Sequence, residues 1–340
     1  MSTTIKDLAR ESGVSPSTVS YVLNNGPRPV SGRTRDKVLA TAKRLNYQPN
    51  AVARGLSRRK MDTLGIIYTY LDAAATDYYF ISILHGILGA CARYEQAATL
   101  FTSHMWADVP ANIPLYCNGR CDGLIIVAPP ANNTFIQQFR ERDMPVVVVN
   151  EIHPDSSIAS VDIDNERAMY DMTKYLLGLG HRRIVLLCGD INQTSAILRE
   201  SGFRRAFGDA KLSDDLFQII PGVYNPESGY EIARRIIAQP KRQWPTALCC
   251  ASDAIAVGAM QALIESGVSV PNDISVTGID DVPLALTTAV PLTSIRQPFT
   301  EIGMHAAEFL LARIAGDTSI RQVHLPATLV VRRSTAPPCR

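Results

Sequence analysis

Beyond about residue 62, strand-length apolar runs alternate with amphipathic stretches of helical length, and this alternation sets the fold class. In 79–94, for example, Ile83, Ile87 and Cys91 recur at the four-residue spacing of one helical face. The pattern predicts strands at 64–71, 99–103, 123–128, 146–150, 184–189, 247–251 and 274–279. It predicts helices at 79–94, 165–178, 228–239 and 253–266. Such alternation is typical of parallel sheets covered by helices, and about 280 residues exceed one ordinary domain, so we expect two α/β lobes.

The sequence contains no candidate membrane span. Its longest apolar runs are strand-sized, whereas a spanning helix needs about 20 residues. The N-terminus shows no apolar signal segment, so we expect a cytoplasmic protein. The seven cysteines are scattered and odd in number, which is typical of reduced, buried thiols. Cys117 and Cys121 would make half of a metal site, but no second ligand pair follows, so we expect no metal and no cofactor.

The first 46 residues have the signals of three short helices. Thr4 and Asp7 form a capping box that begins the first helix, and Gly13 ends it. Ser15 caps the second helix, and Pro16 takes its first position, where no N–H is missed. A third helix is capped by Ser31 or a neighbour. The apolar positions at helical spacing, which should form a small core, are Ile5, Leu8, Ala9, Val19, Val22, Leu23, Val38, Ala42 and Leu45.

Charge is unevenly distributed between this head and the rest of the chain. Residues 1–60 carry twelve Lys or Arg and three Asp or Glu. The remaining 280 residues carry 22 Lys or Arg and 29 Asp or Glu. The glycine turn between the first two helices indicates a helix-turn-helix unit, and Ser17, Thr18 and Ser20 give the second helix a small, polar outer face. An ordinary three-helix unit with a solvated basic face is the alternative. The basic charge of the head, its glycine turn and the polar face of its second helix together favour nucleic-acid binding.

The head resembles the lactose-repressor/galactose-repressor (LacI/GalR) family of regulators. The resemblance lies in 5–9 (Ile-Lys-Asp-Leu-Ala), 13–15 (Gly-Val-Ser), 18–24 (Thr-Val-Ser-Tyr-Val-Leu-Asn), 30–31 (Val-Ser), 34–35 (Thr-Arg) and 45–50 (Leu-Asn-Tyr-Gln-Pro-Asn). It implies base contacts by Pro16, Ser17 and Tyr21. It places near phosphates Thr4, Ser15, Thr18, Asn24, Ser31 and Tyr47. Many relatives carry Arg where this chain has Tyr21, and Tyr cannot read guanine bidentately, so their operator sequences do not transfer.

Residues 50–57 would make about two helical turns, too few for a stable isolated helix, and Gly55 weakens them further. A flexible basic linker is one interpretation. The family resemblance implies instead a hinge helix that orders on DNA, with Leu56 wedged into the minor groove. Asn50, Ala53 and Leu56 are therefore added to the predicted DNA-binding residues.

Ligands of parallel α/β folds bind at the carboxyl ends of the strands. Polar and aromatic residues follow several predicted strands or begin the next helix. Each of them taken alone is weak evidence for a ligand-binding site. An acid at a strand end, such as Asp253, is expected to be a helix cap, and an isolated Tyr is commonly rim packing. Together they suit a polyhydroxyl or planar polar ligand. The family resemblance implies that the ligand-binding residues are Tyr79, Phe80, Asn150, Arg199, Tyr224, Ser252, Asp280 and Gln297.

The family resemblance continues through the body of the chain. It is carried by 161–165, 180–184, 202–203, 245–248, 252–253, 278–281, 291–297 and 329–333. It implies a fold similar to periplasmic sugar-binding proteins, with crossovers between lobes near 161–164, 292–298 and 323–328. Sugar-binding relatives often have Asp where this chain has Asn150 and Asn where it has Ser252. Both differences remove hydrogen-bonding capacity for hydroxyls.

The expected organisation has a helix-turn-helix DNA-binding domain at 1–49, a hinge at 50–61 and an effector-binding and dimerisation body at 62–340. Within the body we expect one lobe at about 62–160 and 298–322, and a second at about 164–291 and 328–340. No leucine heptads follow the last strand-like segment, so we expect a homodimer.

The predicted function is a DNA-binding transcriptional regulator, a repressor of a near-palindromic operator, controlled by a small effector of sugar type. A purine- or other metabolite-responsive corepressor-type regulator is the alternative, followed by a soluble carbohydrate-binding receptor. An enzyme that uses the cleft carboxylates is disfavoured, because no nucleophile elbow, zinc-protease helix, P-loop or dinucleotide fingerprint is present.

Overall fold

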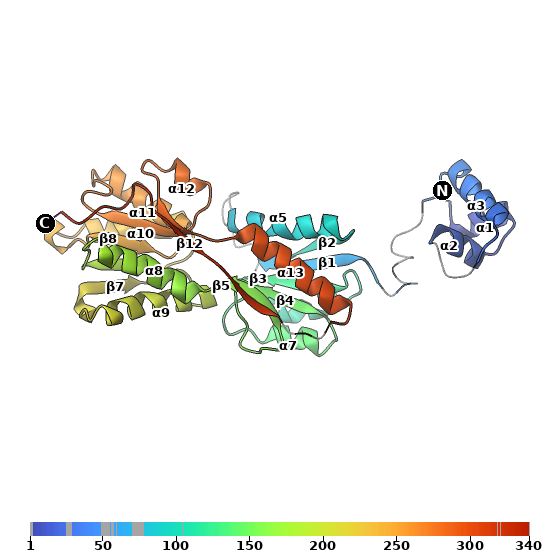
Figure 1. Ribbon diagram of the computed structural model, residues 1–340, viewed down its shortest axis with the longest axis horizontal. Helices are drawn as coiled ribbons and strands as arrows, with labels where there is room; N and C mark the ends of the chain where they lie inside the picture. The colour runs from blue at the N-terminus through green and yellow to red at the C-terminus, as the bar shows by residue number, and fades with distance from the viewer. Residues whose placement is uncertain are drawn as a thin grey trace. The chain divides into compact units, whose positions relative to one another are not determined.

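The computed structural model describes residues 3–24, 29–48, 55, 58, 60–69, 78–103, 105–317, 319 and 321–339. The chain folds as two units, Met1–Met61 and Asp62–Arg340 (Figure 1). The hinge residues Asn50, Ala53 and Leu56 of the sequence prediction lie outside the described residues. No described helix is long and apolar enough to cross a bilayer.

The head has the three predicted helices, α1 (Ile5–Ser12), α2 (Pro16–Leu23) and α3 (Gly32–Arg44). Thr4 and Asp7 form the capping box of α1, and Gly13 ends that helix with a φ of 68°, in the left-handed region. Ser15 and Ser31 accept hydrogen bonds from Thr18 N and Thr34 N as the N-caps of α2 and α3. The buried core of the head is Leu8, Ala9, Val19, Val22, Val38 and Ala42, with Ile5, Val14, Leu23, Val30, Leu45 and Tyr47 packed around it.

The first lobe of the body contains a six-stranded parallel sheet in the order β11-β5-β4-β3-β1-β2. Its strands are β1 (Thr63–Thr69), β2 (Ala97–Ser103), β3 (Gly123–Val127), β4 (Val146–Val149), β5 (Ala159–Ile163) and β11 (Gln322–Leu325). Its helices are α5 (Tyr78–Arg93), α6 (Ile113–Tyr116), α7 (Phe135–Arg140) and α13 (Phe299–Ile314), with single 3-10 turns at Trp106–Asp108 and Pro110–Asn112.

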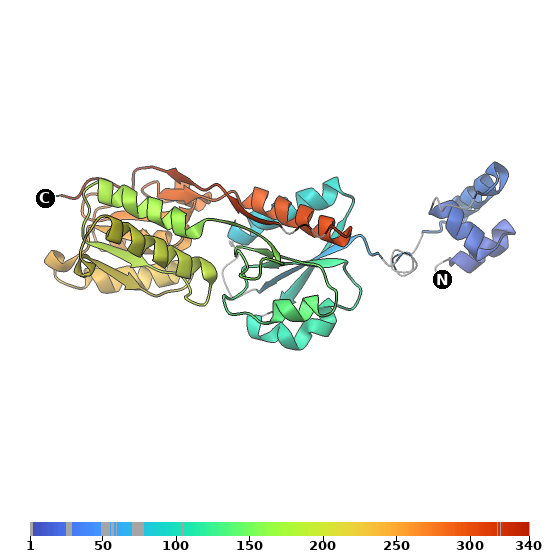
Figure 2. The ribbon, with the colours of Figure 1, turned by 60° about the horizontal axis from the view of Figure 1, so that its bottom comes forward.

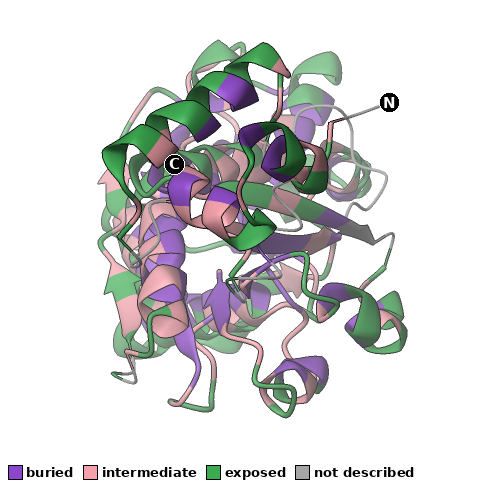
Figure 3. Ribbon diagram, turned by 90° about the vertical axis from the view of Figure 1, so that its right-hand side faces the viewer, coloured by how far each residue is buried: buried purple, intermediate pink, exposed green. Residues whose placement is uncertain are grey.

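Two separate apolar layers cover the faces of this sheet. Ile83 and Ile87 of α5 belong to one core layer, and Phe135 and Phe139 of α7 belong to the other. Helices α5 and α13 pack tightly, because a Cβ at Gly86 would lie 2.0 Å from the carbonyl oxygen of Thr300. Figure 3 shows the resulting pattern, in which single helices carry buried residues on one side and exposed residues on the other.

The second lobe contains a sheet in the order β12-β10-β9-β8-β6-β7. All neighbouring pairs are parallel except β12 with β10. Its strands are β6 (Ile184–Leu187), β7 (Phe217–Ile220), β8 (Ala247–Cys250), β9 (Ser275–Asp280), β10 (Thr293–Arg296) and β12 (Thr328–Val330). Its helices are α8 (Asn165–Gly178), α9 (Thr194–Asp209), α10 (Pro226–Ile237), α11 (Asp253–Glu265) and α12 (Leu284–Thr287), with 3-10 turns at Asp214–Leu216 and Lys241–Gln243.

The chain crosses between the two lobes three times. The crossovers lie between β5 and α8, between β10 and α13, and between β11 and β12, the last visible as an extended segment in Figures 1 and 2. The lobes also touch at a loop, where Ala131 N donates to Asn192 O at 2.7 Å. The predicted two-lobed α/β body on a helix-turn-helix head is therefore confirmed.

Candidate functional site

The head exposes three helix N-termini, each capped by a hydroxyl side chain. Thr4, Ser15 and Ser31 are all exposed at these caps. Uncapped N–H groups and the helix dipole make such N-termini favourable sites for phosphate. Three of the six predicted phosphate contacts therefore lie where the backbone itself favours an anion.

The outer face of α2 carries the predicted base-reading residues. Pro16 and Ser17 are exposed in its first turn, and Tyr21 lies one turn further along. Val19 and Val22 are buried on the opposite face, so the helix presents its polar side outward. Short polar side chains at an exposed helix start allow close approach to a DNA groove.

Two other predicted DNA contacts are partly used inside the head. Asn24 donates through Nδ2 to Ser20 Oγ at 3.2 Å, and Thr18 exchanges a 2.9 Å hydroxyl hydrogen bond with Ser15. Tyr47 is half-buried against the head core.

The remaining predicted site residues lie in the body, several at the carboxyl ends of its strands. Asn150 follows β4 and Asp280 ends β9, with φ values of 65° and 134°. Asn and Asp tolerate this left-handed region better than most side chains. The turns that these residues make are the strand ends at which parallel sheets bind ligands.

Arg199 is the centre of a buried hydrogen-bond network in the second lobe. It lies in the second turn of α9 and is 3% exposed. Its Nε donates to Asn165 Oδ1 at 2.9 Å, and a terminal nitrogen donates to Ala251 O at 2.5 Å. Asn165 Nδ2 in turn donates to Asp162 Oδ2 at 2.8 Å. This network joins the first crossover, at 162–165, to the second sheet.

The ring of Tyr224 lies beside the Arg199 guanidinium, with its centre 5.8 Å from the guanidinium carbon. A Cβ at Gly189 would lie 2.1 Å from the Tyr224 ring, so only glycine after β6 leaves room for this aromatic side chain. The Tyr224 hydroxyl forms a 3.1 Å hydrogen bond with Ser195 Oγ, and burial raises the pKa of Tyr224. Arg199 and Tyr224 therefore form one surface, as the sequence prediction requires.

Asp280 and Gln297 form a second pair at the end of the same sheet. Gln297 Nε2 donates to Asp280 Oδ1 at 2.7 Å, and Gln297 is 5% exposed. The other amide atom, Gln297 Oε1, is buried and accepts no hydrogen bond among the described residues. It is thus an acceptor available to a bound molecule.

Asp253 differs from its prediction as a helix cap. Ser252 is the N-cap of α11, and its hydroxyl accepts from Ile255 N at 3.2 Å. The Asp253 carboxylate turns inward instead, because Ser294 Oγ and Val282 N donate to it at 2.6 and 3.1 Å. Burial, followed by the negative charge of Asp280, raises the Asp253 pKa.

The predicted aromatic residues Tyr79 and Phe80 lie in the first lobe, at the start of α5. Phe80 stacks on Tyr68 with ring centres 4.0 Å apart and an angle of 4° between the ring planes. Tyr79 meets Phe299 edge to face at 5.2 Å. One face of the Phe80 ring is therefore already covered.

Sequence reasoning missed two buried carboxyl groups that act on each other, Asp162 and Glu151. Asp162 on β5 is 1% exposed, and burial raises its pKa to about 7. Glu151 follows Asn150, is also 1% exposed, and has its pKa raised to about 7, chiefly by burial. The positions 161–165 were recognised only as part of a family motif, and nothing in the sequence marked Glu151.

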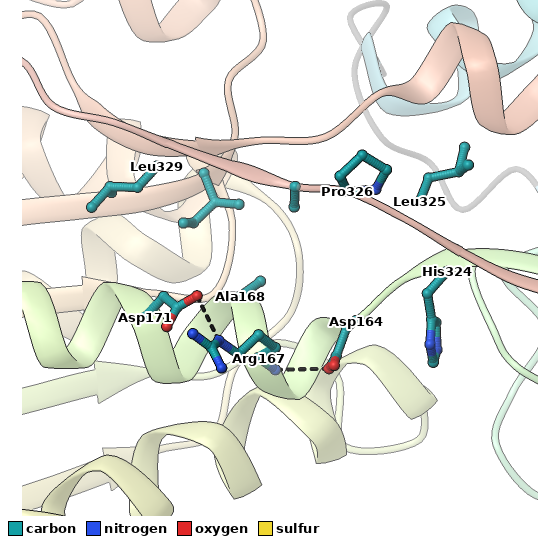
Figure 4. A pocket seen from close by; sticks show the side chains of 10 residues that line it. Asp164, Arg167, Ala168, Asp171, His324, Leu325, Pro326 and Leu329 are labelled. Carbon is teal, nitrogen blue, oxygen red and sulfur yellow. Dashed lines mark hydrogen bonds and ion pairs between the residues drawn. The ribbon is translucent and has the colours of Figure 1, made fainter.

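A groove of about 350 Å³ lies elsewhere, along α8 and the crossover from β11 to β12 (Figure 4). Its charged residues pair with each other: Asp164 accepts from Arg167 N, and Arg167 Nε contacts Asp171 at 2.8 Å. None of the predicted ligand-binding residues lines it. Within the described residues, no cluster of three or more His, Cys, Asp or Glu side chains has the arrangement of a metal site.

Comparison with known proteins agrees with both units. Residues 4–50 match the family described as bacterial regulatory proteins, lacI family, and residues 173–335 match the periplasmic binding protein-like domain. The HTH-type transcriptional repressor PurR of Haemophilus influenzae (strain PittEE) is 34% identical over 338 residues, covering 97% of this chain and 98% of the relative. The repressor PurR of Vibrio atlanticus (strain LGP32) is 35% identical over 337 residues, covering 98% of each.

A solved structure extends the likeness to the fold. The lac repressor dimer bound to operator and the anti-inducer ONPF aligns with a TM-score of 0.87 and 27% identity, covering 99% of this chain and all of that one. These relatives are repressors rather than enzymes. The chain therefore belongs to the lacI family of bacterial regulatory proteins and is a DNA-binding transcriptional repressor.

Proposed function

We propose that this repressor binds a near-palindromic operator as a cytoplasmic homodimer, and that a small effector bound between its two lobes sets its operator affinity. The set of Arg199, Tyr224, Asp280 and Gln297 carries this proposal; Arg199 and Gln297 are buried, and Tyr224 and Asp280 are half-buried. It gathers a cation, a carboxylate, an unused amide oxygen and an aromatic ring at the carboxyl ends of one parallel sheet. A core that served stability alone would have little need of these groups.

We further propose that the effector is a planar, polar heterocycle of the purine class rather than a sugar. A sugar needs many hydrogen-bonding partners for its hydroxyls, whereas the Ser252 hydroxyl is occupied as the cap of α11. Tyr224 offers a ring face, and Arg199 and Gln297 offer a donor and an acceptor that suit the edge of a heterocycle. This choice reverses the preference for a sugar drawn from the sequence.

The dimer is supported by an apolar stripe that the body leaves exposed. Ile81 and Leu88 of α5 lie seven residues apart on one helical face, and they are 52% and 45% exposed. The opposite face of α5, with Ile83 and Ile87, is buried in the first lobe. Exposed aliphatic residues at this spacing suit burial against a second copy of the helix. The solved relative named above is likewise a dimer.

The three-part organisation remains part of the proposal: a DNA-binding domain at 1–49, a hinge at 50–61 and a body at 62–340. In this arrangement α2 enters the major groove, and Thr4, Ser15 and Ser31 meet phosphates through the three helix starts. Asn50, Ala53 and Leu56 of the hinge complete the proposed DNA contacts.

Thermal denaturation of the full chain tests the effector proposal. Adenine, hypoxanthine and unsubstituted purine should raise the Tm in a dose-dependent manner, because a ligand that binds only the folded state stabilises it. Glucose, ribose and cellobiose should leave the Tm unchanged at equal concentration. A shift with the sugars alone would overturn the purine class and keep the effector site. No shift with either group would argue against the site itself.

A further inference from the structure

Glu151 places a carboxylate at the boundary between the two lobes. It follows Asn150 at the carboxyl end of β4 in the first lobe, yet its side chain forms a hydrogen bond with the side chain of Thr194 in the second lobe. Thr194 is the first residue of α9, the helix that also carries Ser195 and Arg199. Glu151 thus lies against the helix that supplies Arg199 to the proposed effector site.

One oxygen of this carboxylate lacks a donor. Glu151 is 1% exposed, and its Oε2 atom is buried and accepts no hydrogen bond among the described residues. A buried carboxylate oxygen without a donor is costly, because the group has lost its water without gaining a partner. Each such group in a native protein calls for an explanation, and a bound molecule that donates the missing hydrogen bond is one.

Among the residues that the structure describes, no cation compensates Glu151. The charged group that acts on it is Asp162 of β5, which is itself a buried carboxyl group and raises the Glu151 pKa further. Arg199 is directed elsewhere, since its nitrogens donate to Asn165 and to the carbonyl of Ala251. From α9, the Thr194 side chain forms a hydrogen bond with Glu151.

Gln297 Oε1 is a second buried acceptor that lacks a hydrogen-bond donor among the described residues. Gln297 bonds Asp280, and both Asp280 and Arg199 act electrostatically on Tyr224. Arg199 is linked through Asn165 to Asp162, which neighbours Glu151. The two unused acceptors, Glu151 Oε2 and Gln297 Oε1, therefore lie at the ends of a series of side chains that interact partly by hydrogen bonds and partly by charge. A ligand that satisfies them must donate hydrogen bonds.

We infer that Glu151 is an effector-contacting residue, and that it selects an effector carrying an amino group whose N–H donates to the Glu151 carboxylate. This inference rests on the proposed effector site and narrows its ligand to amino-substituted rings. Gln297 Oε1 receives a second N–H of the same ligand. Thr194 forms a hydrogen bond with the Glu151 side chain, and the Oε2 atom stays available to the ligand.

Matched ligand pairs test this inference on the full chain. Each pair differs by the amino group: adenine against unsubstituted purine, and glucosamine against glucose. Binding is measured by calorimetry at pH 8, where the Glu151 carboxyl group is ionised. Within the pair that binds, we expect the amino member to bind about tenfold to hundredfold more tightly, as for a hydrogen bond to a charged group.

The Glu151→Gln variant supplies the decisive comparison, because glutamine keeps the size of the side chain and an acceptor for Thr194 but removes the charge. The preference for the amino member should disappear in this variant. The control Glu141→Gln changes an exposed acid of the same lobe and should keep the preference. In the parent chain, the affinity for the amino member should also rise with pH through about 7, the pKa of Glu151, and this dependence should vanish in Glu151→Gln.

The outcomes separate the two levels of the proposal. Equal binding of both members of a pair, or a preference that survives Glu151→Gln, would overturn the role of Glu151 while the effector site stands. Binding by no member of either pair would overturn the effector site and, with it, the role of Glu151.

Discussion

Arg199 donates through Nε to the side-chain oxygen of Asn165 at 2.9 Å, and this contact connects α9 to the first turn of α8. Because α8 begins directly after the crossover from the first lobe, Arg199 connects the proposed effector surface to the segment on which the lobes turn. A molecule that contacts Arg199 would therefore act on the crossover through a single residue, Asn165.

Replacing Arg199 tests this connection. Arg199→Lys keeps the charge, but a single ammonium group cannot reproduce the two directed hydrogen bonds, so at least one buried acceptor loses its partner. We expect a loss of about 1–3 kcal/mol of stability, with the Tm lower by about 2–4 °C per kcal/mol. The effector-dependent change in operator affinity, measured by fluorescence anisotropy, should fall at least about tenfold.

The matched control for this change is Arg204→Lys on the same helix, since Arg204 is exposed and pairs with Glu200. It should alter neither the Tm nor the effector response. A normal effector response in Arg199→Lys would remove Arg199 from the site.

The charge of the head predicts how operator affinity depends on salt. Twelve basic against three acidic residues in 1–60 should release many counterions from DNA, so that log K falls steeply and linearly with log salt. Arg33 is exposed in the first turn of α3, next to the Ser31 cap. Arg33→Gln should reduce the salt slope by about 1, as for loss of one phosphate contact. Lys211→Gln, an equivalent change in the body, should leave the slope unaltered, and an equal reduction there would contradict the assignment to the head.

The exposed stripe on α5 predicts the dimer face. Leu88→Asp places a charge on this stripe, so it should convert the dimer to a monomer in sedimentation equilibrium while the fold, followed by circular dichroism, stays intact. Leu115 on α6 has a similar exposure, 47% against 45%, but lies on a helix that covers the other face of the first sheet. Leu115→Asp should remain dimeric. A dimeric Leu88→Asp protein would place the interface elsewhere.

The raised pKa of Glu151 predicts a pH-dependent stability difference. The folded-state pKa of about 7 lies above the ordinary value of 4.5, so the folded state holds the proton more tightly and loses stability relative to the unfolded state as the pH rises from about 4.5 to 7. Glu151→Gln removes this loss. Its Tm should equal that of the parent chain near pH 4.5 and exceed it by several degrees at pH 8. A lower Tm for the variant at pH 8 would show that the carboxylate is paired after all.

Much of the fold follows from local signals in the sequence. Helix α8 spans 165–178, the predicted range, because its apolar spacing and the Asp164 cap mark both face and start. Strands β3, β4, β6 and β8 lie within one to two residues of their predicted ends, since each is a short run buried on both faces. Strand β7 was absent from the prediction. It is a half-buried edge strand and has a weaker apolar signal.

The chemistry of the candidate site was less accessible from the sequence. The side chains of Arg199 and Tyr224 were recognisable through the family positions they match, and the structure brings them together. Glu151 and Asp162 were not recognisable as buried carboxyl groups, because tertiary packing and not a local sequence pattern sets their burial. The exchange of roles between Ser252 and Asp253 was equally hidden, since it depends on Ser294, 41 residues further along the chain.

Selection of DNA from a random pool by the full chain tests the central claim most directly. A dimeric repressor with one helix-turn-helix unit in each protomer should enrich a near-palindrome whose half-sites lie about one helical turn apart. The enriched site should bind at least about a thousandfold more tightly than random DNA at physiological salt. Enrichment of a single asymmetric half-site, or of no sequence at all, would contradict the account.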